Sequence, residues 1–160
     1  MMPSVLLDTS FFIRLLDDTD PLHKNALGYF KYYLENDIPM CVSTITIAEY
    51  CVKGSFDDLP LKDIRIIPFN IDHAKRCGTF AEVLFRAKND GSLKLNNRNI
   101  IPNDSKLFAQ ADIDKDIDSF VSSDSKSLPL INKLRKECQA KFSLIDINNP
   151  FSETYGLLDL

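Results

Sequence analysis

The chain has 160 residues, of which 44% are hydrophobic and 26% are charged. This length predicts one domain over residues 1–160, large enough to bury a hydrophobic core without disulfides or structural metal ions. We expect the core over residues 4–148 and a C-terminal tail over residues 149–160. The net charge of −4 excludes a general positive field around the protein. A nucleic-acid substrate would therefore need a local basic patch and metal ions to hold it.

The four cysteines, at positions 41, 51, 77 and 138, form no C-x-x-C pair, and the two histidines lie far apart in the sequence. These spacings argue against a structural zinc site and predict buried thiols in a reducing cytoplasm. The N-terminal segment lacks the basic and long apolar regions of a signal peptide. No apolar run approaches the roughly 20 residues that a membrane helix needs, so no membrane contact is expected.

In the first half of the chain, short apolar runs alternate with amphipathic segments. We expect strands over residues 4–7, 39–42 and 64–69, because each is a short apolar run next to turn-forming or capping residues. Helices are expected over residues 11–16, 21–35, 45–53 and 72–88, each preceded by a capping residue or begun by a proline.

The second half continues the same alternation. Residues 89–101 contain Gly91 and several asparagines and are predicted to form a loop. A helix over 105–112, a strand over 118–122, a helix over 129–141 and a strand over 142–147 follow. The tail beyond Pro150 is predicted to be irregular or a short helix. This alternation predicts an α/β fold with a central parallel sheet of about five strands and helices on both faces.

Four acids fall where an α/β sheet of this kind places its chemistry, beyond the carboxyl ends of strands or at the helix starts that follow. Asp8 ends the first strand, Asp124 follows the fourth, Asp104 lies in the first turn of its helix, and Glu49 sits among apolar neighbours in the third helix. Each has an ordinary alternative reading: Asp8 as a helix cap, Asp104 as a partner of the helix dipole, Asp124 as a turn residue and Glu49 as part of a solvated helix edge.

Taken together, the four positions predict a shared site. Carboxylates held close together repel one another, and some stay protonated unless a cation joins them. A hard, all-oxygen cluster suits Mg²⁺ or Mn²⁺. Such a site is suited to metal-assisted hydrolysis of phosphodiester bonds.

The sequence around these acids resembles the PIN-domain nucleases, especially the VapC-type toxins of toxin–antitoxin pairs. Residues 5–10 (VLLDTS) resemble the first motif of that family, and residues 45–49 (ITIAE) resemble the second. Residues 103–111 (NDSKLFAQA) resemble the third motif, and residues 121–124 (VSSD) resemble the fourth. The motifs occur in order across about residues 4–148.

The resemblance implies roles for particular residues. Asp8, Asp104 and Asp124 would hold the metal, and Glu49 would complete the acidic quartet directly or through water. Ser122 and Ser10 would support the metal ligands with their hydroxyls.

The fourth motif departs from the family pattern at one position. It has Lys126 where a second acid often follows. This departure puts a second metal site in doubt and makes Lys126 a candidate phosphate contact.

A basic window precedes and enters the third motif. Between Val83 and Lys106, five cations oppose two acids, for a net charge of +3. The window could form one wall of a groove that binds the phosphates of RNA, or it could be a solubilising loop. RNA as the substrate, rather than DNA, rests on the family resemblance alone. The candidate RNA-binding residues are Arg86, Lys88, Lys94, Arg98 and, from the fourth motif, Lys126.

Two other functions compete with this reading. Phosphohydrolases that use a strand-end aspartate as nucleophile need a second aspartate two residues later, where this chain has Ser10. A PIN-like interaction module without activity is the second rival. The four acids argue against such a module, and Lys126 keeps it open.

Partners are suggested by the second helix. Its residues Tyr29, Phe30, Tyr32 and Tyr33 are too many for one helix face, because adjacent residues point about 100° apart. Some should therefore be exposed or meet another chain. Toxin-like PIN proteins commonly form homodimers and bind a small antitoxin that blocks the site, and we expect both partners here.

Overall fold

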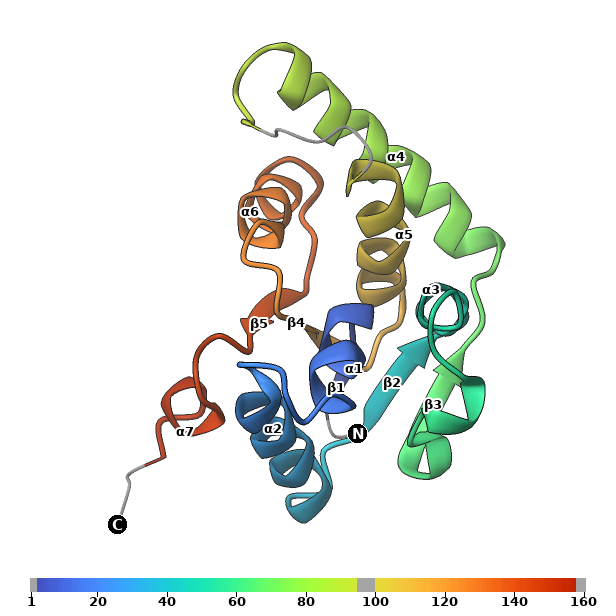
Figure 1. Ribbon diagram of the computed structural model, residues 1–160. Helices are drawn as coiled ribbons and strands as arrows, with labels where there is room; N and C mark the ends of the chain where they lie inside the picture. Colours follow the sequence, from blue (N-terminus) through green and yellow to red (C-terminus); the bar gives the residue numbers. More distant parts are fainter. Residues whose placement is uncertain (1–2, 95–99, 158–160) are drawn as a thin grey trace.

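Five short parallel strands form the central sheet of the computed structural model, which describes residues 3–94 and 100–157 (Figure 1). Their spatial order is β3-β2-β1-β4-β5. The two chain halves thus lie on either side of β1, which pairs with β2 on one side and β4 on the other. The α/β class and the parallel sheet are as predicted. The strands are β1 (Ser4–Leu7), β2 (Met40–Ser43), β3 (Ile64–Ile67), β4 (Ile117–Ser122) and β5 (Ser143–Asp146).

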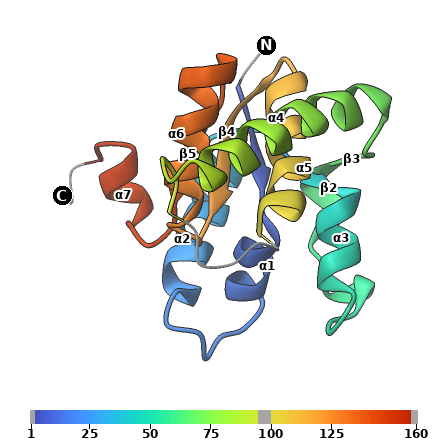
Figure 2. The ribbon, with the colours of Figure 1, turned by 90° about the horizontal axis from the view of Figure 1, so that it is seen from above.

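Helices connect the strands and cover both faces of the sheet. The α-helices are α1 (Thr9–Leu15), α2 (His23–Glu35), α3 (Thr44–Tyr50), α4 (Ile71–Asn89), α5 (Ile100–Ile113), α6 (Ser127–Cys138) and α7 (Phe151–Thr154). Two 3₁₀ turns, Phe56–Asp58 and Leu61–Asp63, lead into β3. Figure 1 shows α4, α5 and α6 grouped on one side of the sheet and α2 and α7 on the other. Figure 2 shows β1 running from the N-terminus into α1 at the opposite end.

Alternating side chains of the strands feed two hydrophobic cores. Leu6 of β1 and Phe120 of β4 belong to the core beneath α4, α5 and α6. Leu7 and Val121, the next residues along the same strands, belong to the core that contains Phe11, Phe12, Tyr29 and Tyr33 of α1 and α2. Successive side chains of a strand point to opposite faces of the sheet. Because both faces are buried here, each strand is apolar along most of its length.

The fifth helix begins earlier than predicted. Residues up to 101 were predicted to form a loop, with Asp104 in the first turn of the next helix. Instead, α5 starts at Ile100 and has no acid in its first turn. Pro102 is tolerated because a helix leaves its first N–H groups unpaired, so the missing N–H of proline costs nothing there. Asp104 is consequently the fifth residue of α5, too deep for the helix-dipole role.

The aromatic residues of α2 are covered by the C-terminal tail of the same chain. Tyr29 and Tyr33 are fully buried. Tyr155 stacks on Tyr32 with ring centroids 4.6 Å apart, and its hydroxyl donates to that of Tyr33 at 3.0 Å. Phe151 also packs on Tyr32, at 5.4 Å. These rings therefore pack against one another within the chain, so covering them does not require a second chain. The homodimer stays a prediction.

Two further expectations can be compared with the structure. Cys41 is buried and Cys77 and Cys138 are half-buried, but Cys51 is exposed, so the prediction of four buried thiols was wrong at that position. Among the described residues, no helix combines the length and apolarity needed to cross a bilayer.

The edge of the sheet where the strands begin carries its own ion-pair cluster. The Arg65 guanidinium lies 2.9 Å from Asp116 and 3.5 Å from Asp114, and it also contacts the Cys41 sulfur. Arg65 is about half exposed. Ser4 adds a hydroxyl bond to Asp116.

The start of α4 contains a buried titratable group, His73, in a capping box. The Asn70 N–H donates to His73 Nδ1 at 3.1 Å, and the His73 N–H donates to Asn70 Oδ1 at 3.0 Å. His73 is 3% exposed, and this burial lowers its pKa because it disfavours the charged ring. Protonation would also remove the acceptor that Asn70 uses.

We therefore expect stability to fall as the pH drops below the unfolded-state pKa of about 6.5, because the unfolded chain takes up a proton that the folded chain refuses. His73→Gln retains a capping acceptor that does not titrate. The loss of unfolding free energy between pH 7 and pH 5 should be smaller in this variant than in the wild type, by about 1 kcal/mol. Urea denaturation at both pH values measures it, and identical pH profiles would contradict the assignment.

Candidate carboxylate site

Asp8 is held at the end of β1 by three hydrogen bonds. Its Oδ1 accepts from the Thr9 N–H at 2.8 Å, which makes Asp8 the cap of α1. Its Oδ2 accepts from the hydroxyls of Ser10 and Ser122, both at 2.8 Å. The helix-cap reading of Asp8 is therefore correct but incomplete, since a cap alone does not require two additional hydroxyl donors.

The two serines also fix the loop that follows β4. The Ser123 N–H donates to Ser10 Oγ, and the Asp124 N–H donates to Ser122 Oγ, each at 3.0 Å. Register explains the meeting, because Leu7 of β1 lies beside Val121 of β4 and both strands end at the same sheet edge. Asp8 and Asp124 are thus joined through Ser122. That Ser10 and Ser122 support a metal ligand stays a prediction.

Asp104 approaches this edge from α5, where the charges of the other three acids act on its carboxyl. Its Oδ2 is buried and has no hydrogen-bond partner among the described residues. Its pKa is raised to about 8, first by burial and then by the charges of Asp8, Asp124 and Glu49, in that order. Burial likewise raises the pKa of Asp8, against the lowering effect of its hydroxyl and N–H donors. The charges of the other three acids therefore reach the Asp104 carboxyl.

Glu49 stands at the outer margin of the site, on α3. Ser43 caps this helix by accepting from the Ile45 N–H at 3.0 Å, so α3 begins where β2 ends. The residue is exposed, as the alternative reading of a solvated helix edge predicts. Partial removal of water still raises the pKa of its carboxyl, with the charge of Asp8 as the second cause. Glu49 therefore joins the site electrostatically while facing solvent.

Asp124 sits in a tight turn before α6. Its Oδ1 accepts from the Lys126 N–H at 3.0 Å, and its carbonyl accepts from the Ser127 N–H at 3.1 Å. The turn-residue reading is therefore also correct. Lys126 is exposed, and its contact with RNA stays a prediction.

The described residues contain no group of three or more His, Cys, Asp or Glu side chains already placed to hold one metal ion. The donor chemistry nevertheless fits a hard cation, because the four side chains offer only oxygen and Asp104 has a buried oxygen without a partner. Mg²⁺ usually binds through one or two carboxylates and keeps several waters. A preformed cage of three ligands is therefore not required.

The basic window does not converge on these acids as one wall. Arg86 pairs with Glu82 at 2.8 Å and lines a hollow of about 260 Å³ between α4 and α6, which none of the four acids lines. Lys88 lies in the last turn of α4, Lys94 is exposed beyond it, and Arg98 lies outside the described residues. Their contact with RNA stays a prediction. Lys106 does lie near the site, since its charge acts on Glu49.

An apolar groove opens beside the acids, between α1 and α3. It measures about 670 Å³, and Thr9 and Glu49 line its inner end. Ile13 and Leu16 form the α1 wall, and Val52, 78% exposed, stands on the other side. The sequence pattern did not predict this groove, because the residues of its two walls are more than 30 positions apart in the chain.

Sequence reasoning also passed over Arg14. Its Nε lies 3.5 Å from the Ser123 hydroxyl, next to the loop that carries Asp124. The available signal was spacing, because Arg14 follows Ser10 by four residues and so shares its helix face.

The serine network makes Ser122 a sensitive position for stability. Ser122→Ala removes one donor from the buried Asp8 carboxylate and leaves the Asp124 N–H without its acceptor. We expect a loss of about 1–3 kcal/mol in unfolding free energy, measured by chemical denaturation. Ser125→Ala, at an exposed position of the same loop, is the matched control and should stay within about 0.5 kcal/mol. Equal effects would mean that the network adds nothing to folding.

No family model matches this sequence, and no curated protein matches it. The solved structures that resemble the fold include three from VapBC or VapC proteins. A chain from DNA-bound VapBC of Salmonella typhimurium has a TM-score of 0.55 at 15% identity, over 91% of this chain and 99% of that chain. A chain from VapBC2 of Rickettsia felis, bound to a promoter DNA fragment, has a TM-score of 0.55 at 16% identity, over 89% of this chain and 97% of that chain.

The third is VapC20 of Mycobacterium tuberculosis, described as a Sarcin-Ricin loop cleaving toxin. It has a TM-score of 0.52 at 19% identity, over 76% of this chain and 91% of that chain. Identities this low establish a common fold rather than a common activity. The protein has the PIN-domain fold of VapC-like proteins, which the four sequence motifs predicted.

Proposed function

We propose that this protein is a metal-dependent endoribonuclease that hydrolyses RNA phosphodiester bonds at the Asp8, Glu49, Asp104 and Asp124 site. The observation that carries the proposal is the Asp104 carboxyl. One of its oxygens is buried and has no hydrogen-bond partner in the part of the chain that the structure describes, and three other acids oppose its ionisation. A cation would relieve both penalties, since it supplies a ligand for that oxygen and offsets the repulsion.

Asp8, Asp104 and Asp124 would hold Mg²⁺ or Mn²⁺, directly or through water. When bound, the ion would supply an activated water and offset charge on the leaving oxygen. The donors from Thr9, Ser10 and Ser122 would keep Asp8 ionised and oriented. Glu49, at the solvent-exposed margin, would accept a proton or hold a water of the ion.

RNA as the substrate is supported by the sequence motifs and by the shared fold with VapC20, whose description is that of a Sarcin-Ricin loop cleaving toxin. By the same reasoning we propose that this chain is the toxin of a toxin–antitoxin pair. We place its action in the cytoplasm, where RNA is available and the free thiols would stay reduced.

The activity is tested by incubating structured RNA and, separately, DNA with the protein in Mg²⁺, in Mn²⁺ and in EDTA. Asp8→Asn and Asp104→Asn keep side-chain shape and remove the charge, so each should reduce RNA cleavage by roughly 100-fold or more. Asp63→Asn is the matched control, because Asp63 is exposed before β3 at the other edge of the sheet. Cleavage in EDTA, or equal activity of wild type and Asp8→Asn, would refute the mechanism. Cleavage of DNA alone would refute the substrate.

Metal binding has its own readout in thermal unfolding. A ligand that binds only the folded chain at a hundred times its Kd adds about 2.7 kcal/mol of stability, so Mg²⁺ or Mn²⁺ should raise the Tm of the wild type. The increase should be absent from Asp104→Asn and retained in Asp63→Asn.

An inactive interaction module is the second candidate, favoured by Lys126 in the fourth motif and by the lack of a preformed three-ligand set. The two assays separate the functions. A Tm increase without cleavage would favour the module.

We also propose two partners, a small antitoxin and a second copy of the chain. The apolar groove between α1 and α3 supports the antitoxin, because exposed Ile13, Leu16 and Val52 lead to Glu49, so a segment seated there would cover the acids. The neighbouring gene tests this proposal, since a small overlapping reading frame is expected. The homodimer is tested by light scattering after size exclusion, where a mass of 18.2 kDa rather than twice that value would contradict it.

A further inference from the structure

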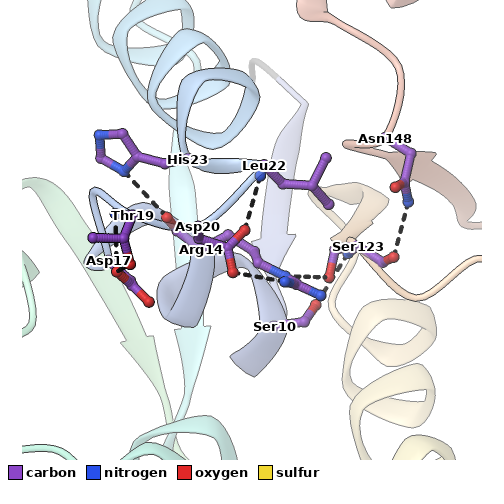
Figure 3. A network of polar contacts seen from close by, with 9 residues as sticks. All are labelled: Ser10, Arg14, Asp17, Thr19, Asp20, Leu22, His23, Ser123 and Asn148. Carbon is purple, nitrogen blue, oxygen red and sulfur yellow. Dashed lines mark hydrogen bonds and ion pairs between the residues drawn. The ribbon is translucent and has the colours of Figure 1, made fainter.

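Arg14 points across the top of the sheet from α1 towards the loop after β4 (Figure 3). It lies one helical turn beyond Ser10, and its side chain is 36% exposed. The path from Arg14 to Asp8 passes through two residues, because Ser123 contacts Arg14 through its hydroxyl and Ser10 through its N–H, and Ser10 donates to Asp8. Arg14 is therefore a cation at the border of the proposed active site.

Two groups hold the guanidinium from opposite sides. Asp20 Oδ2 accepts from Nη1 at 2.6 Å, and the Ser123 hydroxyl lies 3.5 Å from Nε. Both holders are themselves fixed. The Leu22 N–H donates to Asp20 Oδ1 at 2.8 Å, and the Asn148 amide donates to the Ser123 carbonyl at 2.9 Å. We call Asp20 and Ser123 the clamp of Arg14. The clamp connects Arg14 to the α1–α2 connection and, through Asn148, to the end of β5.

The contacts of the described residues leave other donors of the guanidinium unused. Arginine carries five N–H groups, and the contacts above engage Nη1 and Nε. Among residues 3–94 and 100–157, no acceptor is recorded for Nη2. A fork of this kind matches the geometry of a phosphate.

Stability alone is a weak explanation for the clamp. The Arg14 side chain is 36% exposed, and an ion pair that is open to solvent on one side contributes about 1 kcal/mol, while ordering a long side chain such as arginine costs about as much or more. What the arrangement gains is a cation that is already oriented before a ligand arrives, which lowers the cost of binding that ligand.

We propose that Arg14 binds a phosphate of the RNA backbone next to the scissile bond, with Asp20 as its positioning residue. The inference rests on the proposed ribonuclease function and deepens it by assigning a cation that grips the substrate. Arg14 would counter the repulsion between the acid site and the RNA backbone.

Arg65 supplies a matched control. It is also an arginine in an ion pair with an aspartate, at 2.9 Å, and it is about half exposed. It lies on β3 and pairs with Asp116, which precedes β4, so it belongs to the edge where the strands begin. Arg65→Gln therefore removes the same charge and a comparable ion pair from the end of the sheet that lacks the acids.

The experiment measures binding of a fluorescein-labelled, single-stranded RNA of about 12 nucleotides to protein carrying Asp8→Asn, so that cleavage does not interfere. Salt is varied between about 50 and 200 mM. In this background Arg14→Gln should weaken binding about 10-fold and reduce the slope of log K against log salt by about 0.7, the value for one phosphate contact. Arg14→Lys should restore the slope but only part of the affinity, since lysine keeps the charge and loses the fork. Arg65→Gln should change neither quantity.

Asp20→Asn tests positioning separately from charge. Arg14 keeps its charge in this variant but loses its holder, so cleavage by otherwise wild-type protein should show a several-fold higher KM and a nearly unchanged kcat. Thermal unfolding of every variant shows whether folding is affected.

An unchanged salt slope in Arg14→Gln, or equal losses in Arg14→Gln and Arg65→Gln, would overturn the proposal. If the wild type cleaves RNA and Arg14→Gln in the Asp8→Asn background binds RNA as tightly as its parent, the proposed phosphate contact is refuted and the ribonuclease function is retained. If the Asp8→Asn protein binds no RNA and the wild type cleaves none, both fail together.

Discussion

The burial of the Asp8 carboxylate is the constraint on which the rest of the site depends. Placing a carboxylate at the end of an apolar strand removes it from water, which costs several kcal/mol unless donors replace that water. The Thr9 N–H and the hydroxyls of Ser10 and Ser122 provide these donors. Because Ser122 ends β4, Asp8 can be satisfied only when β1 and β4 are correctly paired. A functional group thus also helps to specify strand register.

The same constraint explains why the carboxylates differ. Asp8 receives three donors, whereas one oxygen of Asp104 receives none among the described residues, although both acids share one sheet edge. The protein therefore compensates Asp8 with its own groups and leaves that oxygen of Asp104 uncompensated. An uncompensated buried oxygen lowers stability, and under the proposed function the cation would supply the missing partner.

The fold could be predicted largely because strand and helix periodicities differ. All five strands occur within two residues of their expected bounds, since each is a short apolar run with a clear end. The start of α5 was missed because a proline is read as a helix boundary, although the first turn of a helix accepts it. The covering of Tyr32 and Tyr33 by Tyr155 could not be foreseen, because it joins residues more than 120 positions apart. Periodicity describes one element at a time and carries no information on which distant tail packs against it.

The site shows the same division between local and distant information. Strand ends predicted that Asp8 and Asp124 would lie at one edge, and they do, because parallel strands end at the same edge whatever the intervening sequence does. The contacts that orient Arg14 were not predicted. They involve Asp20, Ser123 and Asn148, which lie in three different connections, and no single sequence motif contains all three. Sequence motifs contain the candidate catalytic residues, whereas the position of a candidate substrate-binding residue such as Arg14 depends on the loops that contact it. We therefore expect proteins of this fold to share the acids at the strand ends and to differ in the cations beside them.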